Sequence, residues 1–189
     1  DTLRFNHKRL QRPPLMDELK LEDGKYIVFT LNRKALIAER DNLKKMLLAM
    51  SKAAAGTPIV APLRENAKRA VEETAAEMPN VHICQPLSYL EFGYLTTHAQ
   101  GIITDSGNVA EEATFNMVPC ITLNSYTEHI ETVKQGSNVL VGEDADKLKS
   151  SVRDMVTDNW KKCALPDRWD GRTAERIVHI LMETLEEGK

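Results

Sequence analysis

Six short apolar runs alternate along this chain with longer segments of helical periodicity, and this alternation constrains the fold more than any other feature. The runs are rich in β-branched residues and lie at residues 26–31, 57–61, 81–84, 101–104, 120–123 and 138–141. They are apolar on both faces, as strands are when helices cover both sides of their sheet. The sequence therefore predicts an α/β domain in which a parallel sheet lies between two layers of helices.

Between and after these runs, apolar residues recur at intervals of three and four, which is typical of amphipathic helices. We expect helices at residues 40–54, 66–77, 87–99, 109–115, 127–135, 144–158 and 172–185. Asp144 stands where the N-cap of the sixth of these helices would be. A chain of 189 residues, 42% of them hydrophobic, is long enough for one domain with a sizeable core.

Charge and cysteine content exclude several classes of protein. A net charge of −3 and an isoelectric point near 6.0 provide no basic surface for nucleic acid or an anionic membrane. No apolar run is long enough to span a bilayer, and no signal peptide opens the chain. Cys84, Cys120 and Cys163 are odd in number and widely spaced, as reduced structural thiols are. We therefore expect a cytoplasmic protein.

Ligands of open parallel α/β sheets bind beyond the carboxyl ends of the strands. In this chain the rule selects the segments that follow the strands, at residues 32–36, 62–66, 86–88, 105–108, 124–128 and 142–144. The functional site is expected among these loops.

The corner after the fourth strand, in the segment ITDSGNVAEEATF, is the most informative of these loops. Gly107 lets a ligand approach the main chain, and Ser106 adds a hydroxyl group. The helix that follows directs its free amide groups to the same place, which suits a phosphate. The simpler interpretation is that Asp105 or Ser106 only caps this helix.

Two adjacent glutamates, Glu111 and Glu112, follow one turn into the same helix. They lie on different faces, so one of them can point back over the strand ends and accept hydrogen bonds from a ribose diol. A binding site for an anion next to a carboxylate that can accept hydrogen bonds from a diol favours a nucleotide as the ligand.

Four segments, ITDSGNVAEEA, FNMVPCITL, YTEHIETVKQGSNVLVG and LPDRWDGRTAERIVHIL, together resemble the carboxyl-terminal half of the non-hydrolysing UDP-N-acetylglucosamine 2-epimerases. That family usually reads D-S-G-G-x-x-E-E-A, then T-E-R-P-E, then G-x-N-x-L-V-G, and ends on a D-G-x-A-x-x-I helix. The resemblance covers the whole chain, since the opening D-T-L is similar to the end of the family's G-N-T-x-x-D-x-L segment.

This resemblance implies a Rossmann-like three-layer fold that forms the carboxyl-terminal half of a glycosyltransferase-B-type two-domain enzyme. Residues 1–189 would be a single UDP-binding domain, preceded by an amino-terminal domain that the terminal helix at residues 172–186 would contact. The implied reaction interconverts UDP-N-acetylglucosamine and UDP-N-acetylmannosamine by elimination of UDP and its re-addition on the other face. A homodimer is the assembly that is common in the family.

The family motifs also imply which residues hold UDP. Ser106 and Gly107 would contact the pyrophosphate, Glu112 the ribose hydroxyls, and Arg33 a phosphate. Phe92, in the segment SYLEF, would lie against the uracil, although packing within its own helix is the simpler role for that ring. Most acid and base groups would come from the amino-terminal domain, so this chain would hold the leaving group.

Four positions depart from the family pattern where the changes matter for catalysis. Asn32 and Arg64 replace histidines, while Asn124 and His129 replace arginines. Asparagine does not titrate and arginine stays charged, whereas a histidine can shuttle a proton near neutral pH. Asn32, Arg64 and His129 are the candidate catalytic residues of this chain.

The same departures leave two alternatives to the epimerase open. One is a module that recognises a UDP-sugar without turning it over, and the other is a domain of a related nucleotide-sugar glycosyltransferase. Cysteines and histidines are scattered singly, with no metal-site spacing, and there is no Walker-type lysine loop or nucleophile elbow. We expect neither a metal nor a cofactor.

Overall fold

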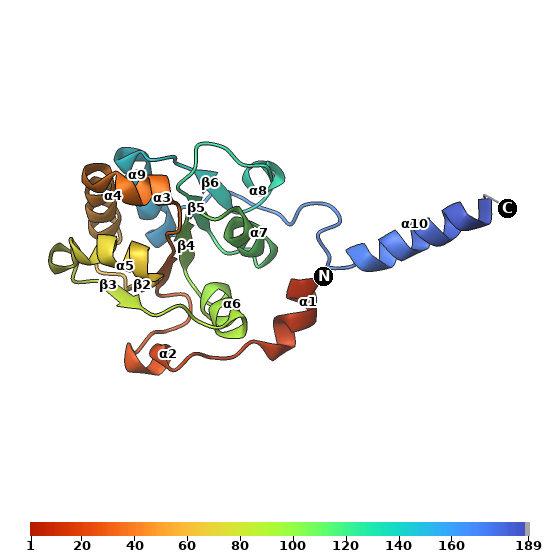
Figure 1. Cartoon of the computed structure of the whole chain (residues 1–189), viewed down its shortest axis with the longest axis horizontal. Helices are drawn as coiled ribbons and strands as arrows, with labels where there is room; N and C mark the ends of the chain where they lie inside the picture. The colour runs from red at the N-terminus through yellow and green to blue at the C-terminus, as the bar shows by residue number, and fades with distance from the viewer. Residues whose placement is uncertain (188–189) are drawn as a thin grey trace.

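One sheet of six parallel strands forms the centre of the computed structural model, which describes residues 1–187 (Figure 1). The strands are β1 (Ile27–Phe29), β2 (Ile59–Pro62), β3 (Val81–Cys84), β4 (Gly101–Thr104), β5 (Cys120–Thr122) and β6 (Asn138–Leu140). Each strand lies within or overlaps one of the six apolar runs, so the predicted parallel sheet is confirmed.

The strand order is β3-β2-β1-β4-β5-β6. The chain builds outward from β1 to β3, returns to β4 on the other side of β1, and then builds outward to β6. Ile27 pairs with Ile59 of β2 and with Gly101 of β4, so the direction of winding reverses at β1. In open α/β sheets such a switch point opens a crevice at the carboxyl ends of the two central strands.

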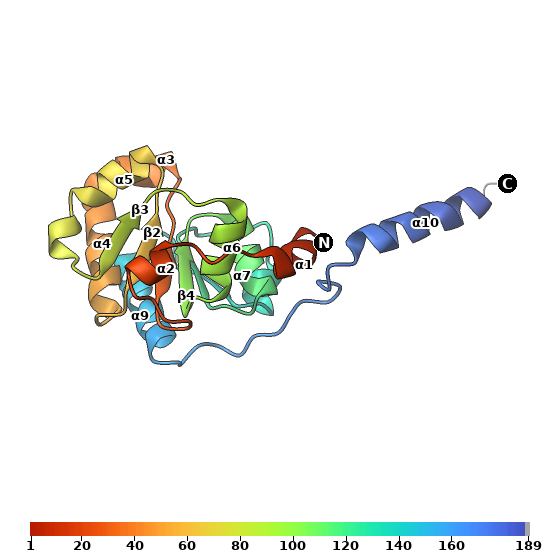
Figure 2. The same cartoon turned by 90° about the horizontal axis from the view of Figure 1, so that it is seen from below.

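Helices cover both faces of the sheet (Figures 1 and 2). One face carries α4 (Arg40–Ala53), α5 (Glu65–Glu72) and α9 (Ala145–Val156), which pack around strand residues such as Phe29. The other face carries α2 (Leu15–Glu18), α6 (Tyr89–Thr97) and α7 (Gly107–Phe115), which pack around Val28. Because neighbouring strand residues point to opposite faces and both faces are buried, the three-layer prediction is confirmed.

The predicted helix at 127–135 is wrong in extent, since only α8 (Glu131–Lys134) is helical there. The hydroxyl of Thr127 accepts a hydrogen bond from the backbone N–H of His129, and the hydroxyl of Thr132 donates one to the carbonyl of His129. Such local bonds offer the backbone an alternative to helix. The segment before α8 is therefore a loop at the edge of the site.

The predicted helix at 66–77 is divided into α5 and a short 3₁₀ helix, η2 (Ala75–Glu77). Pro79 follows two residues later and cannot continue a helix, and the chain enters β3 directly after it. Four further short helices lie outside the seven predicted segments: α1 (Thr2–Asn6), η1 (His7–Arg9), α2 (Leu15–Glu18) and α3 (Lys34–Ala38).

Asp144 caps α9 as expected, because its Oδ1 atom accepts hydrogen bonds of 3.0 Å from the backbone N–H groups of Asp146 and Lys147. All three cysteines are free thiols. Burial raises the pKa of Cys84 to about 11 and that of Cys120 to about 12, which keeps both thiols protonated and unreactive at neutral pH.

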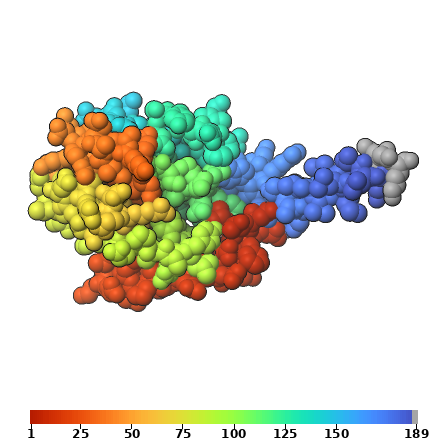
Figure 3. Space-filling model, in the orientation of Figure 1, coloured from red at the N-terminus to blue at the C-terminus, as the bar shows by residue number. Residues whose placement is uncertain are grey.

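The last helix, α10 (Thr173–Glu187), projects from the body of the domain (Figures 1, 2 and 3). Its large apolar side chains are more than half exposed: Ile177, Val178, Ile180, Leu181, Met182 and Leu185. We call this set of six side chains the α10 apolar surface. None of the helices in residues 1–187 has the length and apolar character that crossing a bilayer requires.

Candidate functional site

Asp105, the first residue after β4, holds the loops at the switch point together. Its Oδ2 atom accepts hydrogen bonds from the backbone N–H of Asn32 at 2.7 Å and of Arg33 at 2.5 Å. Its carbonyl oxygen accepts a third from Nδ2 of Asn124 at 3.2 Å. The carboxylate of Asp105 therefore fastens the loop after β1 to β4 and does not cap α7.

Ser106 is the residue that caps α7, since its Oγ atom accepts a hydrogen bond of 3.5 Å from the backbone N–H of Val109. That bond is long, so the hydroxyl retains capacity for another partner. A Cβ atom at Gly107 would meet nothing within 4 Å, so the space over the turn is open. The first amide groups of α7 point out of the helix end, where the helix dipole favours a negative charge.

A cleft of about 520 Å³, which we call the sheet-end cleft, lies at these strand ends. It is lined by residues from four of the loops that the sequence selects: Asn32, Arg33, Arg64, Asp105, Ser106, Asn124 and Tyr126. Three of its buried polar atoms have no hydrogen-bond partner within residues 1–187: Nε of Arg33, Oδ1 of Asp105 and Oδ1 of Asn124. Because buried polar groups are normally paired, these three atoms leave the loops around the cleft with unsatisfied hydrogen-bonding capacity.

The two arginines of the sheet-end cleft differ in their surroundings. Arg33 donates a hydrogen bond of 3.0 Å from Nη2 to the carbonyl of Leu123, and the same nitrogen pairs with the carboxylate of Glu143. Arg64 has an exposed side chain, and no carboxylate in the described chain lies within ion-pairing distance of it. The positive charge of Arg64 is therefore free for a ligand.

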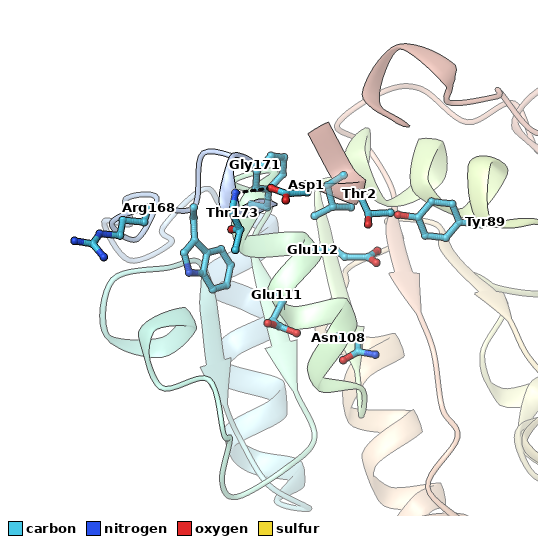
Figure 4. Close-up of a pocket in the computed structure, with 12 residues that line it drawn as sticks. Asp1, Thr2, Tyr89, Asn108, Glu111, Glu112, Arg168, Gly171 and Thr173 are labelled. Atoms are coloured by element: carbon cyan, nitrogen blue, oxygen red, sulfur yellow. Dashed lines mark hydrogen bonds between the residues drawn. The ribbon is translucent and has the colours of Figure 1, made fainter. Parts of the chain in front are cut away.

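A second cleft, of about 550 Å³, runs along the exposed side of α7, and we call it the α7 cleft (Figure 4). From α7 it is lined by Asn108, Glu111, Glu112 and Phe115. The expectation that Glu111 and Glu112 lie on different faces is therefore wrong, because the spacing 108, 111, 112 and 115 places all four on one side of the helix. The opposite walls are formed by Tyr89 and by residues near both ends of the chain: Asp1, Thr2, Leu3, Arg168, Trp169, Gly171 and Thr173. In Figure 4 the carboxylate of Glu112 points into the space beside Tyr89, whereas Arg168 points away.

The electrostatics of the α7 cleft favour a ligand that donates hydrogen bonds. Burial raises the pKa of Glu112, and the charge of the neighbouring Glu111 raises it further. The pKa of the Tyr89 hydroxyl is raised by burial and by the charge of Glu112. A hydroxyl donor beside Glu112 would offset part of the cost of keeping that carboxylate ionised.

His129 contacts one member of this glutamate pair, Glu111. Its Nδ1 atom is 3.3 Å from Oε1 of Glu111 and 3.8 Å from Oε1 of Glu131. His129 also lines a small cleft together with Gly107 and Asn108, at the amino end of α7. No group of three or more His, Cys, Asp or Glu residues in the described part of the chain is arranged to hold a metal ion.

Phe92 is placed apart from the other residues that the family motifs imply. It is half-buried and packs against the core cluster around Val28, and it does not line the α7 cleft. Tyr89, one turn earlier on α6, is 47% exposed and does line that cleft. The uracil contact of Phe92 stays a prediction.

The structure brings Asn32, Arg33, Arg64 and Ser106 together in one cleft, with Gly107 beside it and Glu112 one turn further along α7. Sequence reasoning assigned no site role to Tyr89 or to the residues near both chain ends that line the α7 cleft, and it did not foresee that Asp105 ties two loops together. The i, i+4 spacing of Asn108 and Glu112 is the one signal that could have revealed a shared face.

A doubly wound α/β domain with a polar cleft at its switch point, next to a serine-glycine helix start, is typical of nucleotide-binding proteins. Within that class the comparison with known families is decisive. The family model described as UDP-N-acetylglucosamine 2-epimerase matches residues 1–182, and the chain belongs to this family.

Two relatives illustrate the range of the family. The chain is 34% identical over 168 residues to the UDP-N-acetylglucosamine 2-epimerase of Methanocaldococcus jannaschii, covering 84% of this chain and 45% of the relative. It is 32% identical over 136 residues to the UDP-2,3-diacetamido-2,3-dideoxy-D-glucuronate 2-epimerase of Pseudomonas aeruginosa, covering 71% of this chain and 38% of the relative.

Solved structures give the same fold. A crystal structure of the M. jannaschii UDP-GlcNAc 2-epimerase in complex with UDP-GlcNAc and UDP superposes with a TM-score of 0.73 at 31% sequence identity, covering 94% of this chain and 51% of that one. The chain spans about half the length of the proteins that it matches. Its six-stranded parallel sheet thus corresponds to one half of the two-domain, glycosyltransferase-B-type fold.

Proposed function

We propose that this chain is the nucleotide-binding domain of a UDP-N-acetylglucosamine 2-epimerase, an isomerase that interconverts UDP-GlcNAc and UDP-ManNAc. The observation that carries the proposal is the arrangement around α7. Its amino end opens on the sheet-end cleft through Ser106 and on the small cleft beside it through Gly107, and its exposed side presents Glu112 to the α7 cleft. The amino end of α7 can therefore bind the anionic part of an extended ligand, and the Glu112 carboxylate on the same helix can accept hydrogen bonds from a diol of that ligand.

In this proposal the diphosphate of UDP lies at the amino end of α7. The hydroxyl of Ser106 and the amide of Gly107 donate hydrogen bonds to it, and Arg33 contributes positive charge from the loop after β1. The ribose lies one turn further along, where its hydroxyl groups donate to the carboxylate of Glu112. The raised pKa of Glu112 supports this role, because ribose hydroxyls relieve the unfavourable environment of the charged group.

Two aromatic rings of α6 are candidates for the uracil. Phe92 holds the position that the family motif implies, and it is partly buried against the core. Tyr89 is more exposed and lines the α7 cleft next to Glu112. Replacing each ring in turn by leucine shows which of the two binds the uracil, because loss of stacking on a base should weaken UDP binding by about 1–3 kcal/mol.

For the reaction itself, we propose that this chain stabilises departing UDP while an amino-terminal domain supplies most acid and base groups. Electrostatic stabilisation of a leaving group is a large part of such catalysis. The candidates within this chain are Asn32 and Arg64, which line the sheet-end cleft, and His129, which contacts Glu111.

A module that recognises a UDP-sugar without turnover is the second candidate function. It is favoured by one observation: Asn32 and Arg64, which stand where the family has histidines, both line the sheet-end cleft and neither shuttles protons near neutral pH. In a longer form of the protein with UDP-GlcNAc in deuterated water, exchange at the sugar C2 position distinguishes the epimerase from the module. A glycosyltransferase domain is less well supported, since the family match is to the epimerases.

Isothermal titration of the chain with UDP and with ADP tests the nucleotide site. We expect UDP to bind and ADP to bind at least tenfold more weakly. Glu112→Gln should weaken UDP binding about tenfold, since hydrogen bonds to a charged group contribute about 1.5–3 kcal/mol. Glu72→Gln is the matched control, because Glu72 is exposed on α5 and lines neither cleft, and it should leave UDP affinity within about twofold. Equal or absent binding of UDP and ADP would remove the proposal.

We further propose that the protein acts in the cytoplasm, in which its three free thiols stay reduced, and that the whole protein assembles as a homodimer. Its other partner is an amino-terminal domain, which the α10 apolar surface is suited to contact because six large apolar side chains are exposed there.

A further inference from the structure

We propose that Glu143 is a positioning residue for UDP: its carboxylate holds the guanidinium group of Arg33 in place for the diphosphate. This role rests on the proposed function, in which Arg33 contributes positive charge to the diphosphate site. Glu143 lies in the loop after β6 and lines neither the sheet-end cleft nor the α7 cleft. It therefore acts through Arg33 and does not touch the ligand.

The backbone of Arg33 is fixed next to the amino end of α7. β1 and β4 are neighbours in the sheet, and neighbouring strands are about 4.8 Å apart. Oδ2 of Asp105 accepts a hydrogen bond of 2.5 Å from the backbone N–H of Arg33, and Ser106 is the next residue along the chain. Arg33 and Ser106 both line the sheet-end cleft, so Arg33 lies beside the proposed diphosphate site.

The guanidinium group of Arg33 is held by one of its nitrogens. Nη2 donates a hydrogen bond of 3.0 Å to the carbonyl of Leu123 and another to the carboxylate of Glu143. Within residues 1–187, Nε is buried without a partner, whereas Nη1 makes no hydrogen bond and is not among the buried unpaired atoms. Glu143 thus fixes the group through Nη2 and leaves Nη1 available to a phosphate oxygen.

The loop that carries Glu143 is itself fixed by hydrogen bonds from two directions. The backbone N–H of Gly142 donates one of 3.1 Å to the carbonyl of Asn124, in the loop after β5. Nδ2 of Asn42, on α4, donates one of 3.2 Å to the carbonyl of Glu143. The Glu143 side chain is 38% exposed, so the carboxylate meets Arg33 from a fixed backbone in a partly buried place.

Holding Arg33 in advance affects UDP binding in two opposite ways. Ordering a long side chain on binding weakens affinity on the order of two- to tenfold, and Glu143 removes that cost by ordering Arg33 in the free protein. The negative charge of Glu143 acts against this gain, because it weakens the attraction of the site for a diphosphate. Substitutions that remove the same charge but differ in hydrogen bonding separate the two effects.

Glu143→Gln and Glu143→Met are such a pair, with side chains of similar length and no charge. The glutamine oxygen can still accept a hydrogen bond from Nη2 of Arg33, whereas the methionine side chain has only a weak acceptor. Titrations followed by ¹H–¹⁵N NMR measure even millimolar affinities. UDP should bind Glu143→Met about fivefold more weakly than Glu143→Gln. Uridine has no phosphate group and should bind the two variants within about twofold of each other.

Two further measurements show whether Glu143 acts through Arg33. When each variant is combined with Arg33→Met, the difference in UDP affinity between Glu143→Gln and Glu143→Met should disappear. In the free protein, the buried Nε–H of Arg33 should exchange slowly with solvent in the wild type and in Glu143→Gln, and faster in Glu143→Met.

Glu73→Gln and Glu73→Met are the matched controls. Glu73 also pairs with an arginine, Arg40, but it is exposed and lines neither cleft. The two control variants should bind UDP within about twofold of each other.

Equal UDP affinity of Glu143→Gln and Glu143→Met, in a chain that binds UDP, would overturn this role of Glu143 and leave the UDP site intact. A difference that persists together with Arg33→Met would also overturn it, because Glu143 would then act without Arg33. Loss of UDP and uridine affinity by the same factor in Glu143→Met would indicate a damaged loop and likewise overturn it. Absence of UDP binding to the wild type would remove the proposed function and the role of Glu143 together.

Discussion

Asp1 and Thr173 join the two ends of the chain: Oδ1 of Asp1 accepts a hydrogen bond of 2.8 Å from the backbone N–H of Thr173. The other oxygen, Oδ2, accepts one of 2.6 Å from the backbone N–H of Ala174. Asp1 therefore caps the helix that begins at residue 173, although 172 positions separate Asp1 from Thr173 in the sequence. The same two ends form one wall of the α7 cleft, so this contact shapes the cleft in which we place the ribose.

Removing the Asp1 carboxylate should loosen the start of α10. In Asp1→Ala both acceptors are lost, and we expect the first turn of α10 to be destabilised by about 1 kcal/mol, as for other N-cap losses. Amide hydrogen exchange at Thr173 and Ala174 measures the effect directly. Asp1→Asn keeps one acceptor oxygen and should lie between the wild type and Asp1→Ala. Unchanged exchange in Asp1→Ala would mean that the contact does not persist in solution.

Gly171 should resist substitution for two separable reasons. Its φ of +70° disfavours any side chain, and a Cβ atom there would lie 2.7 Å from Cβ of Arg4. Gly24 has a similar φ of +73° but nothing within 4 Å of an added Cβ, so it isolates the backbone cost. We expect Gly24→Ala to lose about 1–2 kcal/mol of unfolding free energy in urea, and Gly171→Ala to lose more. Equal losses of unfolding free energy in Gly24→Ala and Gly171→Ala would show that the Arg4 side chain moves away from the added Cβ atom at no energetic cost.

Asp105 should be a stability determinant of the site rather than a ligand contact alone. Asp105→Ala removes the acceptor for the backbone N–H groups of Asn32 and Arg33, and we expect a loss of about 3 kcal/mol in urea unfolding. Asp105→Asn retains a carbonyl oxygen that can accept both bonds, so it should recover most of that loss. If Asp105→Ala and Asp105→Asn are both as stable as the wild type, the hydrogen bonds of the Asp105 carboxylate contribute nothing to the stability of the fold.

Glu112 should cost the protein stability at neutral pH. Its pKa is raised in the folded state above the ordinary value of 4.5, so the folded state binds a proton more readily than the unfolded state does. Its contribution is therefore most favourable below pH 4.5 and is lost as the pH rises through the raised pKa. Glu112→Gln should raise the melting temperature at pH 7.5, and the gain should shrink toward pH 4. A gain that is the same at both pH values would contradict the effect of burial on Glu112.

The α10 apolar surface should make the chain self-associate when no other domain covers it. Leu181 is 58% exposed at its centre, and Leu181→Lys should shift sedimentation velocity profiles toward the monomer while leaving urea unfolding within about 0.5 kcal/mol. His179→Lys places the same charge on the polar side of α10, where it can still pair with Glu183, and should leave association unchanged. Loss of association in both variants would indicate a general charge effect.

Periodic features of the sequence determined the layers, the parallel sheet and the edge at which the site lies. Alternation of apolar runs and amphipathic segments is a local signal, and the carboxyl ends of parallel strands meet at one edge whatever the loops contain. The sequence alone therefore assigns Arg33, Arg64 and Ser106 to loops at this edge of the sheet. The family motifs added the ligand class.

Tertiary structure alone decided the direction in which individual side chains point. It assigned the cap of α7 to Ser106 and gave Asp105 a different role, it turned Phe92 toward the core and left Tyr89 at the α7 cleft, and it joined Asp1 to α10. These outcomes depend on contacts between residues far apart in the sequence, which produce no periodic pattern. Local hydrogen bonds of Thr127 and Thr132 likewise overrode the helical pattern of residues 127–135, because they satisfy the backbone without a helix.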